Sequence, residues 1–102
     1  MKVVLCSVPV EAAETLASTL VEERLAACVN VHRDITSVYR WEGRVERRRE
    51  AMLVVKTSDA ALGRLVARIA AVHPYSVPEI VALDVDSVNE KYLQWVDSET
   101  SA

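Results

Sequence analysis

The feature that most constrains the fold of this chain is a long two-stranded segment in its middle, residues 28–57. Two runs of 14 residues each, 28–41 and 44–57, have strand-like composition, and Glu42-Gly43 is the strong turn signal between them. At about 3.3 Å per residue each arm would extend about 45 Å, whereas a compact domain of this length is about 35 Å across. The tip of the predicted hairpin must therefore protrude into water or lie on another subunit.

The composition of the tip favours another subunit. Tyr39 and Trp41 are large and partly apolar, and they lie close to the predicted turn. Leaving them on a bare two-stranded ribbon would forfeit burial of about 1.5–3 kcal/mol each. We therefore expect the chain to assemble with copies of itself.

The remaining segments predict strands and helices in a definite order. Residues 3–8 are nearly all apolar, as in a central strand, and residues 78–85 alternate as in a last strand. Ser58 is a good N-cap for a helix that must end by His73, because Pro74 disfavours a helical residue before it. Ser87-Val88-Asn89-Glu90 forms a capping box that predicts a short C-terminal helix. The first predicted helix has an apolar stripe: Ala13, Leu16, Ala17, Leu20, Val21 and Leu25.

The order is β-α-β-β-α-β with a small helix at the end. It predicts one α+β domain over residues 1–102, a ferredoxin-like split βαβ sandwich with two helices on one face of a four-stranded sheet. The other face would keep apolar side chains uncovered, which also favours self-association. The two-residue strand period predicts that Val29, Val31, Ile35, Tyr39 and Trp41 point one way, although His32-Arg33-Asp34 interrupts the pattern as a bulge would.

Charge and composition exclude several classes of partner. The net charge is −3, and the basic run at 47–49 is bracketed by Glu46 and Glu50, so a solvated strand edge is favoured over nucleic-acid binding. No apolar run approaches the ~20 residues that span a bilayer, so no membrane contact is expected. Two cysteines and no signal-peptide pattern favour free thiols in the cytoplasm.

Several segments, taken in order, match a known family. They are residues 23–30 (ERLAACVN), 37–43 (SVYRWEG), 73–80 (HPYSVPEI) and 92–95 (YLQW), together with Glu50 and Lys56-Thr57. In this order and spacing they resemble the CutA divalent-cation tolerance family across essentially the whole chain. The resemblance implies a tight homotrimer built like the PII signalling proteins, located in the cytoplasm, linked to tolerance of copper and other divalent metals, and without an established catalytic reaction.

The resemblance also implies a candidate metal site. In members of the family, copper ligands have been assigned to positions that carry Cys6, Val72 and His73 in this chain, so the thiol and one imidazole are kept and the second histidine is lost. These ligand types suit copper or zinc, bound weakly, but two ligands are too few for a closed site. The structural alternative is that Cys6 is a buried core residue and His73 ends a helix.

A second Cys–His pair, Cys28 and His32, falls on one face of the predicted hairpin arm. Four residues along a strand leave both side chains pointing to the same side, so a shared ion is conceivable. With no third ligand in view, we predict no metal site there.

A second group of residues predicts a cleft between subunits. Charged groups beside apolar strands are rarely buried unless paired, so Glu50, Lys56 and Glu79 predict an ion pair that fixes the hairpin to the segment after Pro78. The functional alternative is that these residues line an inter-subunit pocket: Tyr39, Trp41, Glu50, Lys56, Tyr75 and Glu79.

Three functions follow as hypotheses. The first is a non-catalytic, cytoplasmic homotrimer that acts in the response to divalent metal ions, with copper as a weakly bound ligand. The second is a PII-like sensor with a small-molecule effector in the inter-subunit cleft, and the third is a scaffold that presents a surface to a partner. No enzyme is predicted, because a catalytic cysteine needs an exposed, electropositive setting and Cys6 lies in an apolar strand.

Overall fold

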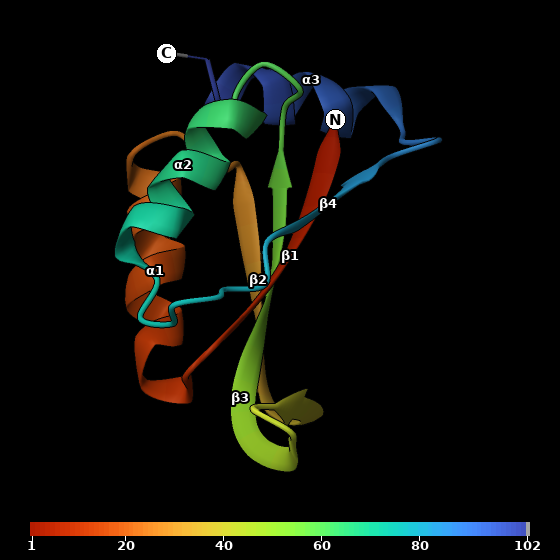
Figure 1. The fold of residues 1–102 in the computed structure, drawn as a ribbon. Helices are drawn as coiled ribbons and strands as arrows, with labels where there is room; N and C mark the ends of the chain where they lie inside the picture. The colour runs from red at the N-terminus through yellow and green to blue at the C-terminus, as the bar shows by residue number, and fades with distance from the viewer. Residues whose placement is uncertain (102) are drawn as a thin grey trace.

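The structure is a computed structural model that describes residues 1–101. The chain forms an α+β domain, and Figure 1 shows its arrangement. The elements in order are β1 (Lys2–Val8), α1 (Val10–Glu22), β2 (Cys28–Trp41), β3 (Arg44–Thr57), α2 (Leu62–Val72), β4 (Val81–Asp84) and α3 (Glu90–Glu99).

The four strands form one antiparallel sheet in the order β2-β3-β1-β4, which confirms the ferredoxin-like prediction. β1 is central, with β3 on one side and β4 on the other. The hairpin between β2 and β3 turns at Glu42 and Gly43, whose φ angles are 50° and 79°. Two successive positive φ angles are what a type I′ turn requires, and this turn matches the right-handed twist of the two strands.

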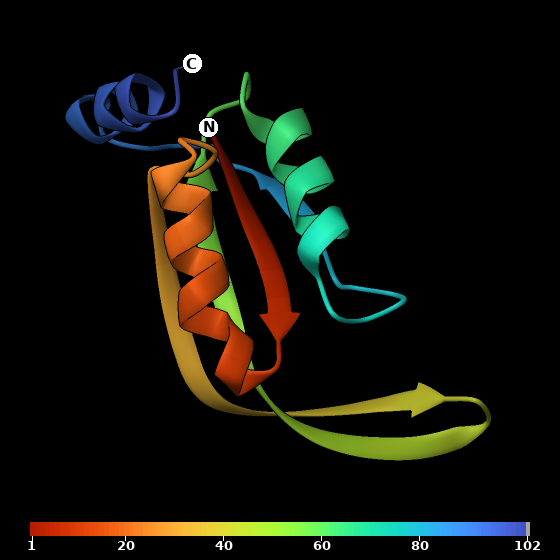
Figure 2. The ribbon, with the colours of Figure 1, turned by 90° about the vertical axis from the view of Figure 1, so that its left-hand side faces the viewer.

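Helices α1 and α2 both cover the same face of the sheet, as Figures 1 and 2 show. The core between the layers takes one set of alternating strand residues and the apolar stripes of both helices. Its fully buried members are Val4, Cys6, Val8, Ala13, Leu20, Ala51, Leu53, Val55, Leu65 and Ile69. These side chains give the two-layer fold its hydrophobic stabilisation.

The opposite face of the sheet keeps an apolar surface that α1 and α2 do not cover. By the strand registers, the residues on this side alternate with those of the core. We call it the open face, and its apolar members are Val3, Leu5, Met52, Val54, Val81 and Leu83. Val81 and Leu83 are exposed by 43% and 46%, so the apolar second face expected from the sequence is present.

The long hairpin carries a bulge that corrects one prediction. The register passes from His32 opposite Met52 to Ile35 opposite Glu50, so β2 has one more residue than β3 across this step. Asp34 accommodates the extra residue with a φ of 61°. The prediction that one face carries all the odd residues of β2 is therefore wrong. Val29 and Val31 face the helices, whereas the odd residues beyond the bulge lie on the side of the open face: Ile35, Ser37, Tyr39 and Trp41.

The hairpin also bends beyond the bulge. Figure 2 shows its outer half turning sideways from the body and passing below the loop that follows α2. The domain consequently measures 45 × 25 × 22 Å, with the hairpin contributing to its long axis. The protruding tip expected from the sequence is present, and Trp41 is 45% exposed on it.

Three predicted boundaries differ from the structure. β4 begins at Val81 instead of residue 78, and Pro78 has no N–H to donate to a strand neighbour. Helix α2 begins at Leu62, although the Ser58 hydroxyl does accept the Ala61 N–H at 3.2 Å in the turn before it. The predicted capping box is not formed, because α3 begins at Glu90 and its N-cap makes no side-chain hydrogen bond.

Candidate functional site

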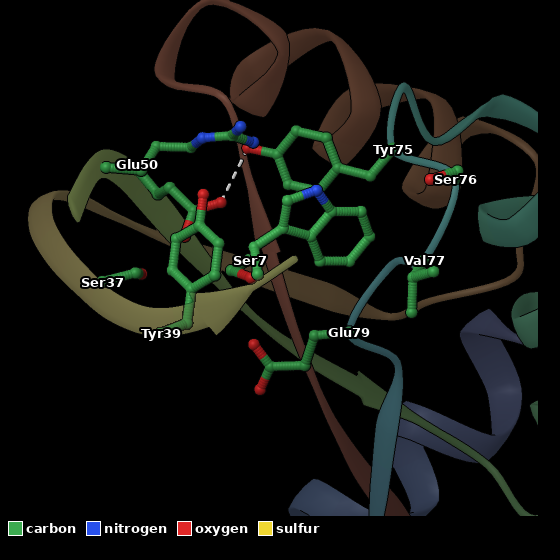
Figure 3. A pocket seen from close by; sticks show the side chains of 10 residues that line it. Ser7, Ser37, Tyr39, Glu50, Tyr75, Ser76, Val77 and Glu79 are labelled. Atoms are coloured by element: carbon green, nitrogen blue, oxygen red, sulfur yellow. Dashed lines mark hydrogen bonds between the residues drawn. The ribbon is translucent and has the colours of Figure 1, made fainter. Parts of the chain in front are cut away.

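A cleft of about 410 Å3 lies between the outer hairpin and the loop that joins α2 to β4. Its walls come from β1, β2, β3 and the 75–79 segment, as the close view in Figure 3 shows. The lining residues are Ser7, Ser37, Tyr39, Trp41, Arg48, Glu50, Tyr75, Ser76, Val77 and Glu79. Five of the six predicted cleft residues are therefore brought together, within a single chain.

The bulge at 32–34 is what makes this cleft. Without the extra residue, Tyr39 and Trp41 would continue on the face of Val29 and Val31, toward the helices. With it, they share a face with Arg48 and Glu50 on the partner strand β3. The bend of the hairpin then carries this face to the 75–79 segment.

Tyr75 makes the central contacts of the cleft. Its hydroxyl donates a hydrogen bond of 2.7 Å to Glu50 Oε2, the dashed line in Figure 3. The guanidinium carbon of Arg48 lies 4.6 Å from the centre of the Tyr75 ring and 5.9 Å from that of Tyr39. Burial, and then the bond to Glu50, raise the pKa of Tyr75, so the hydroxyl stays a proton donor at neutral pH.

The predicted ion pair of Lys56 is not formed. Glu50 is buried, with 4% of its surface exposed, yet within residues 1–101 no ion pair includes Glu50, Glu79 or Lys56. Lys56 lies six residues from Glu50 along β3, which is about 20 Å in an extended strand. It lies opposite Val3 and Cys28, and it does not line the cleft.

The candidate metal ligand Cys6 is fully buried among core residues. Burial raises the pKa of its thiol to about 12, and the negative charges of Glu79 and Glu50 add to the effect. The thiol is therefore protonated at neutral pH, whereas a soft metal ion binds the thiolate. Cys6 and Cys28 are both free thiols.

His73, the other candidate ligand, uses both of its ring nitrogens. Nε2 lies 2.9 Å from the carbonyl oxygen of Ser7, and Nδ1 accepts the backbone N–H of Tyr75 at 3.1 Å. This pattern fixes the neutral tautomer with the proton on Nε2, because the Ser7 carbonyl can only accept. His73 thus ties the end of β1 to the start of the cleft loop, and no ring nitrogen is left for an ion.

No three His, Cys, Asp or Glu side chains lie close enough to hold a metal ion together in the described part of the chain. Cys6 and His73 would therefore need a further ligand, and a change in the hydrogen bonds of His73, to hold an ion. The second pair considered from the sequence, Cys28 and His32, is separated by four residues of β2, about 13 Å along an extended strand, which is too far to share an ion.

Comparison with known proteins agrees with this fold and with the family resemblance of the sequence. Residues 2–99 match the family described as CutA1 divalent ion tolerance protein. The chain belongs to the CutA family. It is 51% identical over 100 residues to the divalent-cation tolerance protein CutA of Thermus thermophilus, covering 97% of each chain. It is 42% identical over 90 residues to human Protein CutA, and the aligned region covers 88% of this chain and 50% of that protein.

Solved CutA structures superpose closely on this one. The Thermus thermophilus CutA1 structure has a TM-score of 0.94 at 50% identity, covering 99% of this chain and 100% of that one. A structure described as the PII-like protein CutA from Nostoc, in apo form, has a TM-score of 0.95 at 39% identity, covering 99% and 98%. The names of the family and of the Thermus thermophilus protein describe divalent-cation tolerance and not an enzymatic reaction.

The relatives also bear on size and location. The chain spans about half the length of the human and plant CutA proteins, and both plant proteins are described as chloroplastic. Among residues 1–101, no helix is long and apolar enough to cross a membrane.

Sequence reasoning missed several residues of the cleft. Arg48 was interpreted as part of a solvated strand edge, and Ser7, Ser37, Ser76 and Val77 were not considered. A signal for Arg48 was available. Counted back from a two-residue turn at Glu42-Gly43, residue 48 pairs with Ser37 and therefore shares a face with Tyr39.

Proposed function

We propose that this CutA protein is a non-catalytic, cytoplasmic homotrimer that acts in the response to divalent metal ions. The observation that carries the proposal is the match to the divalent ion tolerance family over residues 2–99. The free thiols of Cys6 and Cys28 suit the reducing conditions of the cytoplasm.

The open face supports the trimer. Its six apolar side chains form a continuous surface on the central strands β1 and β3 and the neighbouring strand β4, and two of these side chains are almost half exposed. Continuous apolar surface of this kind marks protein–protein contacts. The protruding hairpin adds Val45, exposed by 63%, which a neighbouring subunit would cover.

Substitution on the open face tests the assembly. Val54→Lys places a charge in the centre of this face, and we expect light scattering to show loss of the trimer to a mass near the 11.3 kDa of one chain. Val21→Lys, at an exposed position of α1, is the matched control and should leave the mass unchanged. A monomeric wild-type protein at micromolar concentration would refute the trimer.

The biological role is tested in the source cells. We expect deletion of the gene to lower growth in graded copper, zinc and cobalt, and the wild-type gene to restore it. Unchanged growth of the deletion strain in all three metals would refute the role in metal tolerance.

A more specific proposal is that Cys6 and His73 bind copper. The geometry requires two changes for this. The ion must replace the Cys6 proton, and His73 must release either Ser7 or the Tyr75 N–H. Affinity should therefore be weak and should rise with pH. Copper titration of wild type, Cys6→Ala and His73→Ala tests this directly, and identical binding by all three would remove the site.

Binding of a small-molecule effector is the second candidate function, and the cleft favours it. A cavity of about 410 Å3 with aromatic walls and a few charged groups is typical of a ligand site. The likeness to a CutA structure described as PII-like supports a signalling role. Lys56 does not line the cleft of its own chain. In a trimer, the Lys56 of a neighbouring subunit would have to complete the predicted inter-subunit cleft.

A panel of metabolites tests the effector function. A ligand at 100 times its dissociation constant should add about 2.7 kcal/mol to stability, which raises the melting temperature. The substitution Trp41→Ser removes one aromatic wall of the cleft and should abolish the shift in melting temperature. Absence of any shift across the panel would refute this second function.

A further inference from the structure

The cleft presents charges of both signs that do not pair with each other. Arg48, Glu50 and Glu79 all line it, yet in the part of the chain that the structure describes none of them takes part in an ion pair. Arg48 is exposed, and its guanidinium lies beside Tyr75 instead of against a carboxylate.

Tyr75 contacts a charged group on either side. The centre of its ring lies 4.6 Å from the Arg48 guanidinium carbon, and its hydroxyl donates to Glu50 at 2.7 Å. A guanidinium has five N–H donors, so a contact with one tyrosine leaves donors for a carboxylate. Figure 3 shows Glu79 apart from Tyr75 and Glu50, and Glu79 lines the same cleft.

We propose that the cleft binds a small zwitterion, a molecule with one carboxylate and one ammonium group. Arg48 binds the carboxylate, and Glu79 binds the ammonium with Glu50 behind it. Trp41 and Val77 contact the carbon chain between the two groups. This inference rests on the proposal that the cleft takes a small-molecule effector, and it names the chemical class of that effector.

Ligands with a single charge fit less well. A simple anion would meet one guanidinium and two carboxylates, and a simple cation would leave Arg48 without a partner. A bare divalent ion would have only Glu50 and Glu79 as carboxylate ligands beside a fixed positive charge, and no group of three metal ligands is found in residues 1–101. A zwitterion satisfies both signs at once.

Fluorescence provides a direct assay, because the chain has two tryptophans and one of them lines the cleft. In a Trp95→Phe background, Trp41 is the sole reporter, and Trp95 is exposed enough for the replacement to be tolerated. The probes are glycine, β-alanine, γ-aminobutyrate, δ-aminovalerate and ε-aminocaproate, which differ in the distance between their charges. Pentylamine and pentanoate carry one charge each and match the length of δ-aminovalerate.

We expect a saturable change in Trp41 fluorescence with an optimum at one chain length, and at least about tenfold weaker binding of the single-charge probes. Arg48→Gln and Glu79→Gln should each weaken binding of the best zwitterion about tenfold or more. Arg47→Gln is the matched control, because Arg47 lies on the opposite face of β3, and it should bind like the parent.

Three results would overturn the inference. Equal binding of pentylamine or pentanoate, or unchanged binding in Arg48→Gln and Glu79→Gln, would show that the cleft does not select a zwitterion, while leaving it as an effector site. No saturable change with any zwitterion would also overturn the inference. In that case the metabolite panel still decides separately whether the cleft binds another class of molecule.

Discussion

Alkaline pH should destabilise this protein through one buried thiol. Burial raises the pKa of Cys6 from its ordinary 9.0 to about 12. The thiol contributes its full share of stability below about pH 9, and this share is lost as pH rises from 9 to 12, because the unfolded chain ionises first. A thousandfold difference in acidity corresponds to a total of about 4 kcal/mol per subunit.

The loss within a practical pH range follows from the same two values. At pH 10 the unfolded thiol is about nine-tenths ionised, and the linkage relation lowers the free energy of unfolding by about 1.4 kcal/mol. At pH 10.5 the loss is about 2 kcal/mol. Cys6→Ala has no thiol to ionise at this position, so its stability should not include this loss.

Guanidinium denaturation of wild type and Cys6→Ala under reducing conditions, at one protein concentration and from pH 7 to 10.5, measures the effect. All other titrating groups, including Cys28, are common to both proteins and cancel in the difference. The free-energy difference should be constant up to about pH 8.5 and should then shift toward the variant by the amounts above. Parallel curves over the whole range would refute the argument that Cys6 is a protonated, desolvated thiol.

Three further predictions concern stability. Tyr75→Phe leaves the buried Glu50 carboxylate without its donor and should cost about 1–3 kcal/mol in denaturant unfolding; an unchanged midpoint would mean that water replaces the hydroxyl. Leu53→Ala removes a fully buried side chain of β3 and should cost about 2–5 kcal/mol in the same assay; a cost below about 0.5 kcal/mol would contradict its burial. Gly43→Ala forces a side chain to a φ of 79° and should lower the melting temperature, with a cost of about 1 kcal/mol; equal melting would contradict the assigned turn.

Much of the fold could be predicted because local chemistry determines it. The turn at Glu42-Gly43 and the end of α2 before Pro74 each depend on residues within a few positions of one another. The helical stripe of α1 is similar, since Leu16 and Leu20 are one turn apart and both face the core. The predicted capping box is absent because α3 begins at Glu90, so that Asn89 and not Ser87 is the N-cap residue.

The candidate site was only partly predictable. The rule that charges beside apolar strands are paired groups its acidic members with the aromatic ones, but it also includes Lys56, about 20 Å from Glu50 along the strand. The same kind of reasoning places Arg48 on a solvated strand edge, although its position beside Tyr75 gives the cleft its positive charge. For His73, residue type suggested a ligand, whereas the structure shows both ring nitrogens already bonded.

The sequence by itself determined the order of the strands and helices, the position of the hairpin turn and the presence of a second apolar sheet face. These follow from hydrophobic periodicity and from residues with restricted backbone angles, which act over short distances. Only the tertiary structure shows which face carries Tyr39 and Trp41. One extra residue in β2 reverses the alternation of its side chains, and this residue is identified by the pairing of β2 with β3. Strand pairing is a contact between distant segments, and a cleft built on it depends on that pairing.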